Sequence, residues 1–250
     1  MKLFAALSVL ALSLSACTSQ SATAQNSGVS ATPAASASAA PANSLVVAEL
    51  FTSQGCSSCP SAEKLFSKLA ERDDLLTLEW HVDYWDDLVH HGSRWKDPYS
   101  DREFTRRQRS YNRSIRGTNA GYTPQAVVNG HFEGVGSRPG TVDNMINKAP
   151  AHSISAQITG NKLVVGPSSE AADIVFLRLL DRHETDVKGG ENKGRKLSGR
   201  NIVLEANVIG KSGPQSKELS LPAVGGGETC AVILQTQAGD LGGVLGAAKC

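Results

Sequence analysis

Two cysteines separated by two residues are the feature of this sequence with the clearest chemical meaning. Cys56 and Cys59 follow a short apolar run at 45–51 and precede a segment, 60–69, whose apolar residues recur at helical spacing. The pair is therefore expected where a strand turns into a helix. Free amide N–H groups and the positive end of the helix dipole favour a thiolate over a thiol at such a position. We expect Cys56 to be an exposed nucleophile with a lowered pKa and Cys59 to be the buried resolving thiol.

The same spacing also fits two less reactive structures, an inert disulfide and one half of a zinc site. Zinc generally takes four ligands, and the sequence has no second Cys-x-x-Cys and no ordered pair of histidines to complete the set. A protein that relays a metal ion through Cys56, Cys59 and His81 is a third alternative. We expect redox chemistry at the pair, without a bound metal or organic cofactor.

A second expected strand, 75–82, runs directly into Asp83, Tyr84 and Trp85. The carboxyl ends of parallel strands meet at one edge of a sheet, so these three side chains are candidates for the wall of the site. Capping of the core is the alternative role for the two aromatic residues.

A proline opens the third expected strand. Thr123-Pro124 stands directly before the apolar residues 125–128, and proline fits the first position of a strand because it has no N–H to donate to the ladder. Asn129-Gly130 then indicates a tight hairpin. Residues 141–149 have the apolar spacing of a short helix.

This order of elements over residues 45–148, with a helical insertion before the proline strand, resembles thioredoxin and glutaredoxin. The resemblance implies an α/β fold, a cis peptide bond between Thr123 and Pro124, and a place for both residues beside the Cys pair. Gly55 stands where thioredoxin has tryptophan, and Leu50 where thioredoxin has a buried acid. Glu49 or Asp83 would then have to supply that acid.

Six segments narrow the resemblance further: ELFTSQGCSSCP, HVDYWD, WKDP, RQRSY, YTPQAVVNG and GENKGRKL. Together they resemble a secreted bacterial thioredoxin-like family that is catalogued as a domain of unknown function. The resemblance covers nearly all of residues 45–248. It implies the fold and a redox site but no particular substrate.

The N-terminus has the pattern of a secretory signal. Lys2 precedes an apolar run at 3–14, which is too short for the roughly 20 residues of a spanning helix. Residues 14–17, Leu-Ser-Ala-Cys, resemble a bacterial lipobox, which implies removal of residues 1–16 and lipidation of Cys17. Cleavage after Ala22 or Ala24 by an ordinary signal peptidase is the alternative.

Residues 17–44 would then be a lipidated cysteine followed by a disordered tether rich in Ala, Ser and Thr. Thr18 follows the cysteine where an inner-membrane signal would have Asp. By resemblance to the sorting of Gram-negative lipoproteins, this implies the periplasmic face of the outer membrane.

Residues 151–250 change to short alternating runs that predict a β-rich, sandwich-like second domain after the thioredoxin-like domain at 45–150. A polar, glycine-rich stretch at 188–195 is expected to be a flexible loop. Cys230 and Cys250 are the two remaining cysteines, which an oxidising compartment would allow to pair. A buried free Cys230 beside a free terminal Cys250 is the alternative.

The composition limits the class of function. The chain has 250 residues, with 25 Lys and Arg against 24 Asp and Glu, and 40% of its residues are hydrophobic. These values indicate a globular protein and argue against bulk nucleic-acid binding. We expect a membrane-tethered thiol-disulfide oxidoreductase whose partners are envelope proteins with thiols or disulfides. A non-catalytic binding protein with a structural disulfide is the main alternative.

Overall fold

The computed structural model describes residues 45–90 and 92–250, so the expected signal peptide, Cys17 and the tether lie outside the described residues. The helices are α1 (Pro60–Leu69), α2 (Arg102–Arg116) and α3 (Pro139–Lys148). The strands are β1 (Val46–Thr52), β2 (Leu75–His81), β3 (Gln125–Val128), β4 (Phe132–Val135), β5 (Ala156–Thr159), β6 (Lys162–Val165), β7 (Asp173–Asp186), β8 (Lys196–Lys211), β9 (Lys217–Ser220), β10 (Glu228–Ala238) and β11 (Asp240–Lys249).

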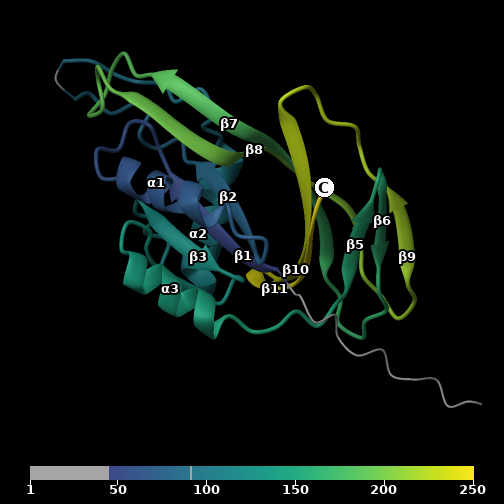
Figure 1. Cartoon of the computed structure of the whole chain (residues 1–250). Coiled ribbons are helices and arrows are strands. Elements are labelled where there is room, and N and C mark those ends of the chain that lie inside the picture. Colours follow the sequence, from purple (N-terminus) through teal and green to yellow (C-terminus); the bar gives the residue numbers. More distant parts are fainter. Residues whose placement is uncertain (1–44, 91) are drawn as a thin grey trace, which may run out of the picture. The chain divides into compact units, whose positions relative to one another are not determined.

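A large mixed sheet organises the described chain, with strand order β11-β10-β7-β8-β2-β1-β3-β4 (Figure 1). Strand β1 pairs in parallel with β2 and antiparallel with β3, which forms a hairpin with β4. All seven residues of β2 are buried, including the polar Thr77, Glu79 and His81, as is typical of a central strand.

Alternation along β1 sends its side chains into two different cores. Ala48 and Leu50 pack with residues of α1 and α3, among them Phe66 and Ile146. Residues of the other face pack with α2 and with the later strands; this second core contains Val47, Phe51, Trp80, Phe104, Tyr111, Leu177 and Ile233. Helices therefore cover both faces of the β1–β2–β3 region.

The second core shows that the predicted boundary near residue 150 does not separate two domains. Residues 45–250 fall in one compact unit, and strand β8 lies beside β2, with Ile202 opposite Glu79. The expectation of a separate second domain is therefore corrected: the strands of residues 151–250 extend the sheet of the first half. Without β8, one edge of β2 would have unpaired backbone N–H and C=O groups, and pairing with β8 covers that edge.

The β-rich character of residues 151–250 is as predicted, and part of this segment does form a second layer. A three-stranded sheet, β5-β6-β9, is joined to the large sheet by a shared apolar cluster that includes Leu163, Phe176 and Val232. Cys230 and Cys250 form a disulfide with Cα atoms 5.1 Å apart, which ties β10 to the end of the chain. Within the described residues, no helix is long and apolar enough to cross a bilayer.

Candidate functional site

Cys56 and Cys59 form a disulfide in the connection between β1 and α1, with Cα atoms 5.5 Å apart. Cys59 is the N-cap residue of α1, and Pro60 follows at the first helical position, where its missing N–H has no cost. The backbone N–H of Cys59 donates to the carbonyl of Cys56 at 3.2 Å. We call residues 53–59 the Cys loop.

Both cysteines are fully buried, so the expectation of an exposed Cys56 is wrong for the disulfide form. The residues between them, Ser57 and Ser58, are exposed, whereas the sulfur atoms face inward. The Cys loop also has a contact from a distant part of the chain that the local sequence pattern does not reveal.

That contact comes from residues 187–195, the connection between β7 and β8, which we call the 187–195 loop. Asn192 is fully buried, and its Nδ2 donates to the carbonyls of Gln54 and Cys56, both at 2.9 Å. The backbone N–H of Ser57 donates to Glu191 Oε2 at 2.8 Å. The stretch expected to be a flexible polar loop is thus bonded to the Cys loop along its backbone.

The peptide bond between Thr123 and Pro124 is cis, as the resemblance implied. Thr123 Oγ1 accepts a hydrogen bond from Trp85 Nε1 at 2.9 Å. Trp85 also lies against Gly55, where an added Cβ would be 3.2 Å from the Cβ of Trp85. Trp85 therefore links the cis-proline segment to the Cys loop, and the small residue at position 55 makes room for it.

The other two expected wall residues have different surroundings. Tyr84 is half-buried, and burial raises the pKa of its hydroxyl to about 12. Asp83 accepts from the hydroxyl of Thr105, on α2, at 2.5 Å. The carboxylate of Asp83 is thus engaged with α2.

Glu49 is also engaged elsewhere. Its carboxylate accepts from Arg107 Nε at 2.6 Å and from the Tyr111 hydroxyl at 2.5 Å, both on α2. These contacts place it in the core between β1 and α2. Neither of the acids expected to assist the Cys pair, Glu49 or Asp83, is therefore free to do so.

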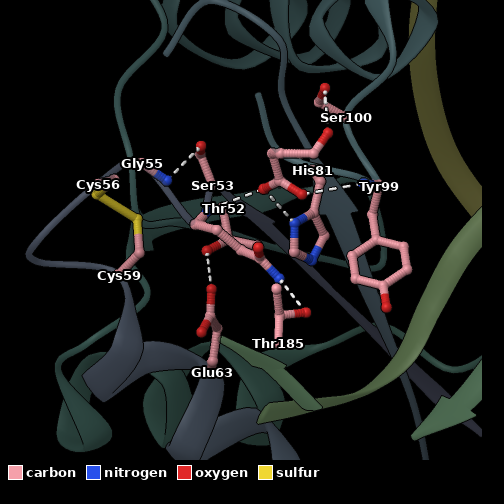
Figure 2. A network of polar contacts seen from close by, with 12 residues as sticks. Thr52, Ser53, Gly55, Cys56, Cys59, Glu63, His81, Tyr99, Ser100 and Thr185 are labelled. Atoms are coloured by element: carbon pink, nitrogen blue, oxygen red, sulfur yellow. Dashed lines mark hydrogen bonds and ion pairs between the residues drawn. A yellow bond between two sulfur atoms is a disulfide. The ribbon is translucent and has the colours of Figure 1, made fainter. Parts of the chain in front are cut away.

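The acid that the structure offers instead is Glu63, which the sequence analysis missed. It lies one helical turn after Cys59 on α1, is 1% exposed, and accepts a hydrogen bond from Thr52 Oγ1 at 2.7 Å (Figure 2). Burial raises the pKa of its carboxyl. An acid four residues after the second cysteine, on the helix face that carries Phe66, is the sequence signal that could have identified it.

A buried network connects the Cys loop to β2 and β7 (Figure 2). Asp97 Oδ2 accepts from the backbone N–H of Gln54 and contacts His81 Nδ1, both at 2.7 Å. Burial disfavours both charges, yet their mutual attraction raises the pKa of His81 and lowers that of Asp97. Gln54 Nε2 donates to Thr185 Oγ1 at 3.1 Å, which reaches β7.

Among the described residues, the side chains placed to hold a metal ion are Glu79, His81 and His183. Of these, only His81 was a candidate ligand from the sequence, as a partner of the cysteines in a metal relay. Closure of the Cys56–Cys59 disulfide leaves no thiolate for such a relay in this form of the protein.

Comparisons with known proteins place the chain in a family. A crystal structure of a protein from Agrobacterium tumefaciens is 30% identical and matches with a TM-score of 0.67, over 82% of this chain and 92% of that one. HBP35 of Porphyromonas gingivalis, 12% identical with a TM-score of 0.51, matches over 83% of this chain and 74% of its own and is similar in fold alone. No curated protein matches the sequence. The family model described as "Protein of unknown function (DUF1223)" matches residues 47–235, and the chain belongs to this family.

Proposed function

We propose that the protein is a thiol-disulfide oxidoreductase with a thioredoxin-like first half. The observation that carries the proposal is the Cys56–Cys59 disulfide at the start of α1, joined through Trp85 to the cis Thr123–Pro124 bond. The order β1-α1-β2-α2-β3-β4-α3, with β1 parallel to β2 and antiparallel to β3, supports the thioredoxin-like assignment.

The reaction is an exchange of two electrons between this disulfide and a protein dithiol. A substrate thiolate attacks Cys56 Sγ, the Cys56–Cys59 bond breaks, and Cys59 leaves as a thiolate. The second substrate thiolate then attacks the mixed disulfide, so the substrate disulfide forms and Cys56 leaves as a thiolate. The substrate is oxidised and the protein is reduced; the same steps in reverse reduce a substrate disulfide.

Glu63 is the candidate acid for proton exchange with Cys59. It is four residues after Cys59 along α1, and its raised pKa lets it hold a proton closer to neutral pH than an exposed acid would. The carboxyl would give its proton to the departing Cys59 thiolate and take it back when Cys59 attacks a mixed disulfide.

Exchange with a protein substrate requires the 187–195 loop to move. Asn192 and Glu191 bind the backbone of the Cys loop, and both sulfur atoms are inaccessible while these contacts hold. In this proposal the oxidised chain is closed, and opening of the 187–195 loop gives substrates access to Cys56.

The complete burial of the Cys pair specifically favours a second candidate, a binding protein that keeps the disulfide for stability. Reduction under native conditions distinguishes the two. An oxidoreductase should equilibrate with glutathione buffers and give two labelled thiols when reduced, whereas a structural disulfide should stay unlabelled until the chain unfolds. Trapping of mixed disulfides by Cys59→Ala in cell extracts would then identify the substrates; recovery of none would contradict the oxidoreductase proposal.

The proposed location is the periplasmic face of the outer membrane, through lipid on Cys17. The lipobox-like residues 14–17 support this placement. Fractionation of cells that express Cys17→Ser tests it: the variant should leave the membrane fraction for the soluble one, and unchanged membrane association would contradict lipidation.

A further inference from the structure

Three buried side chains converge beside the Cys loop without taking part in the proposed exchange. They are Glu79 and His81 of β2 and His183 of β7, and one ligand atom from each lies within 4.8 Å of the others. Glu79 and His81 are fully buried and His183 is 6% exposed. Two imidazoles and a carboxylate are a set that binds first-row transition metals.

The sheet explains why these residues meet. Glu79 and His81 are two positions apart on β2 and so share one face of the sheet. Strand β8 lies between β2 and β7, and strands on either side of a common neighbour are about 9.5 Å apart. Gly199 of β8 pairs with His183, and the absence of a side chain there lets residues of the two outer strands meet above β8.

Gly199 also defines the space between the ligand atoms. A Cβ added at this position would collide with Glu79 Oε2 and with His183 Nε2. A strand interior is normally weakened by glycine, which usually marks a bulge or the close approach of another group. Here the approaching groups are two of the three candidate ligands.

The atoms that face one another have no hydrogen-bond partner among the described residues. They are both carboxylate oxygens of Glu79, Nε2 of His81 and Nε2 of His183. The Arg200 backbone N–H favours the Glu79 carboxylate but forms no hydrogen bond of ordinary geometry with it. Buried polar atoms are nearly always bonded, so four such atoms at one point indicate a ligand that they share.

Contacts on the far side of each ring aim the free nitrogens into this space. His81 Nδ1 is 2.7 Å from Asp97 Oδ2, and His183 Nδ1 is 3.3 Å from Thr185 Oγ1. A histidine that binds metal through one nitrogen usually bonds a carboxylate or another acceptor through the other, which fixes its tautomer and orientation. The ring of Tyr99 packs on both imidazoles, with centroids 5.5 Å from His81 and 4.9 Å from His183.

We propose that Glu79, His81 and His183 form a binding site for a divalent transition metal ion of the zinc class. Zinc bonds of about 2.0–2.2 Å would bring tetrahedral ligand atoms to roughly 3.5 Å from one another, which small side-chain rotations achieve. A water molecule would complete the coordination, and the Glu79 carboxylate would offset part of the metal charge. The site does not depend on the proposed thiol-disulfide exchange.

Titration of the untagged, metal-free full chain with Zn²⁺ alone tests the proposal. The Cys56–Cys59 disulfide is kept oxidised so that thiolates do not contribute. Calorimetry or competition with a chromogenic chelator should show one Zn²⁺ bound per chain with a Kd in the micromolar range or below. Co²⁺ in place of Zn²⁺ should give visible d–d absorption without the thiolate charge-transfer band that cysteine ligands produce.

Glu79→Gln and His183→Gln should each weaken Zn²⁺ binding at least 100-fold. Gly199→Ala should weaken it as well, although it removes no ligand, because its methyl group occupies the space between them. His152→Gln is the matched control, since His152 is another buried histidine with an unpartnered Nε2, and it should bind Zn²⁺ like the parent.

Failure of the parent chain to bind Zn²⁺, or unchanged affinity in folded Glu79→Gln and His183→Gln, would overturn the site. If a variant does not fold, the parent chain still decides the question, because Zn²⁺ should raise its Tm and the Co²⁺ spectrum should show nitrogen and oxygen ligands. A cobalt spectrum with thiolate bands would assign the metal to cysteine and contradict the proposal.

Discussion

At the scale of single residues, Glu63 is the most informative side chain of the site. A buried carboxyl with a raised pKa, one turn from Cys59, should transfer the proton on which resolution of a mixed disulfide depends. General acid–base catalysis typically contributes about 10²–10⁴-fold. We predict that Glu63→Gln slows resolution of a mixed disulfide on Cys56 at least tenfold and flattens the pH dependence of that step.

Stopped-flow measurement of resolution with a chromogenic mixed disulfide checks this prediction. Glu71→Gln, an exposed acid just beyond α1, is the control and should resolve at the parent rate. An unchanged rate and pH profile in Glu63→Gln would show that Glu63 is only a structural partner of Thr52.

His152 provides a second prediction at this scale. Burial lowers its pKa to about 4, from an ordinary value of 6.5. Between these values the unfolded chain binds a proton that the folded chain does not, so stability is retained above about pH 6.5 and falls as the pH decreases toward 4. The unfolding free energy of the parent should fall between pH 7 and pH 4.5. We predict that in His152→Gln this fall is smaller by about 2 kcal/mol.

Urea unfolding at both pH values measures this difference. His131→Gln is the control, because His131 is exposed, and it should lose as much stability on acidification as the parent. Parallel pH dependence in His152→Gln and the parent would show that other groups account for the acid sensitivity.

At the scale of elements, the proposed exchange depends on the 187–195 loop, which is bonded to the Cys loop. Asn192 binds the 187–195 loop to the Cys loop through two hydrogen bonds to backbone carbonyls, both at 2.9 Å. We predict that Asn192→Ala increases the rate at which dithiothreitol reduces the Cys56–Cys59 disulfide about tenfold, because the closed state loses both contacts. The change should appear in the rate and leave the sequence of chemical steps unaltered.

Timed quenching with a thiol-specific label, followed by peptide mapping, follows this reduction separately from that of Cys230–Cys250. Asn144→Ala, on the exposed surface of α3, is the matched control. Equal reduction rates in Asn192→Ala and the control would mean that the loop does not limit access.

Local sequence signals predicted the elements around the site well. The strand-to-helix junction at the Cys pair, the proline at the start of β3 and the turn after it all depend on neighbouring residues. Asn129 and Gly130 adopt φ of 45° and 68°, the left-handed values that a tight hairpin requires. These features follow from chemistry within a few positions of one another.

Contacts between distant segments could not be predicted in the same way. Asn192 binds Cys56 across 136 positions, and His183 meets Glu79 only because of the register of β7 on β8. The period of apolar residues fixes which face a side chain occupies, but it leaves open the strand order and a shift of register by two residues. The burial of Cys56 and the metal-binding cluster were therefore beyond the sequence analysis.

At the scale of the whole molecule, the sheet shared by both halves determines how the chain should unfold. Trp80 and Phe51 from the first half pack in one core with Leu177 and Ile233 from the second. Removal of residues 151–250 would expose this core and leave the edge of β2 unpaired. The two segments that the sequence suggested as separate domains are therefore expected to depend on each other for stability.

We predict that the oxidised chain unfolds in urea in a single cooperative transition. The three tryptophans, Trp80, Trp85 and Trp95, all lie in the first half, whereas most strand residues lie in the second. Tryptophan fluorescence and far-UV circular dichroism thus report on different halves, and coincident curves would indicate one cooperative unit. A chain cut after Pro150 should fail to give the cooperative fluorescence transition of the parent. Two separated transitions in the full chain, or a cooperatively folded fragment 45–150, would instead show that the first half forms a domain of its own.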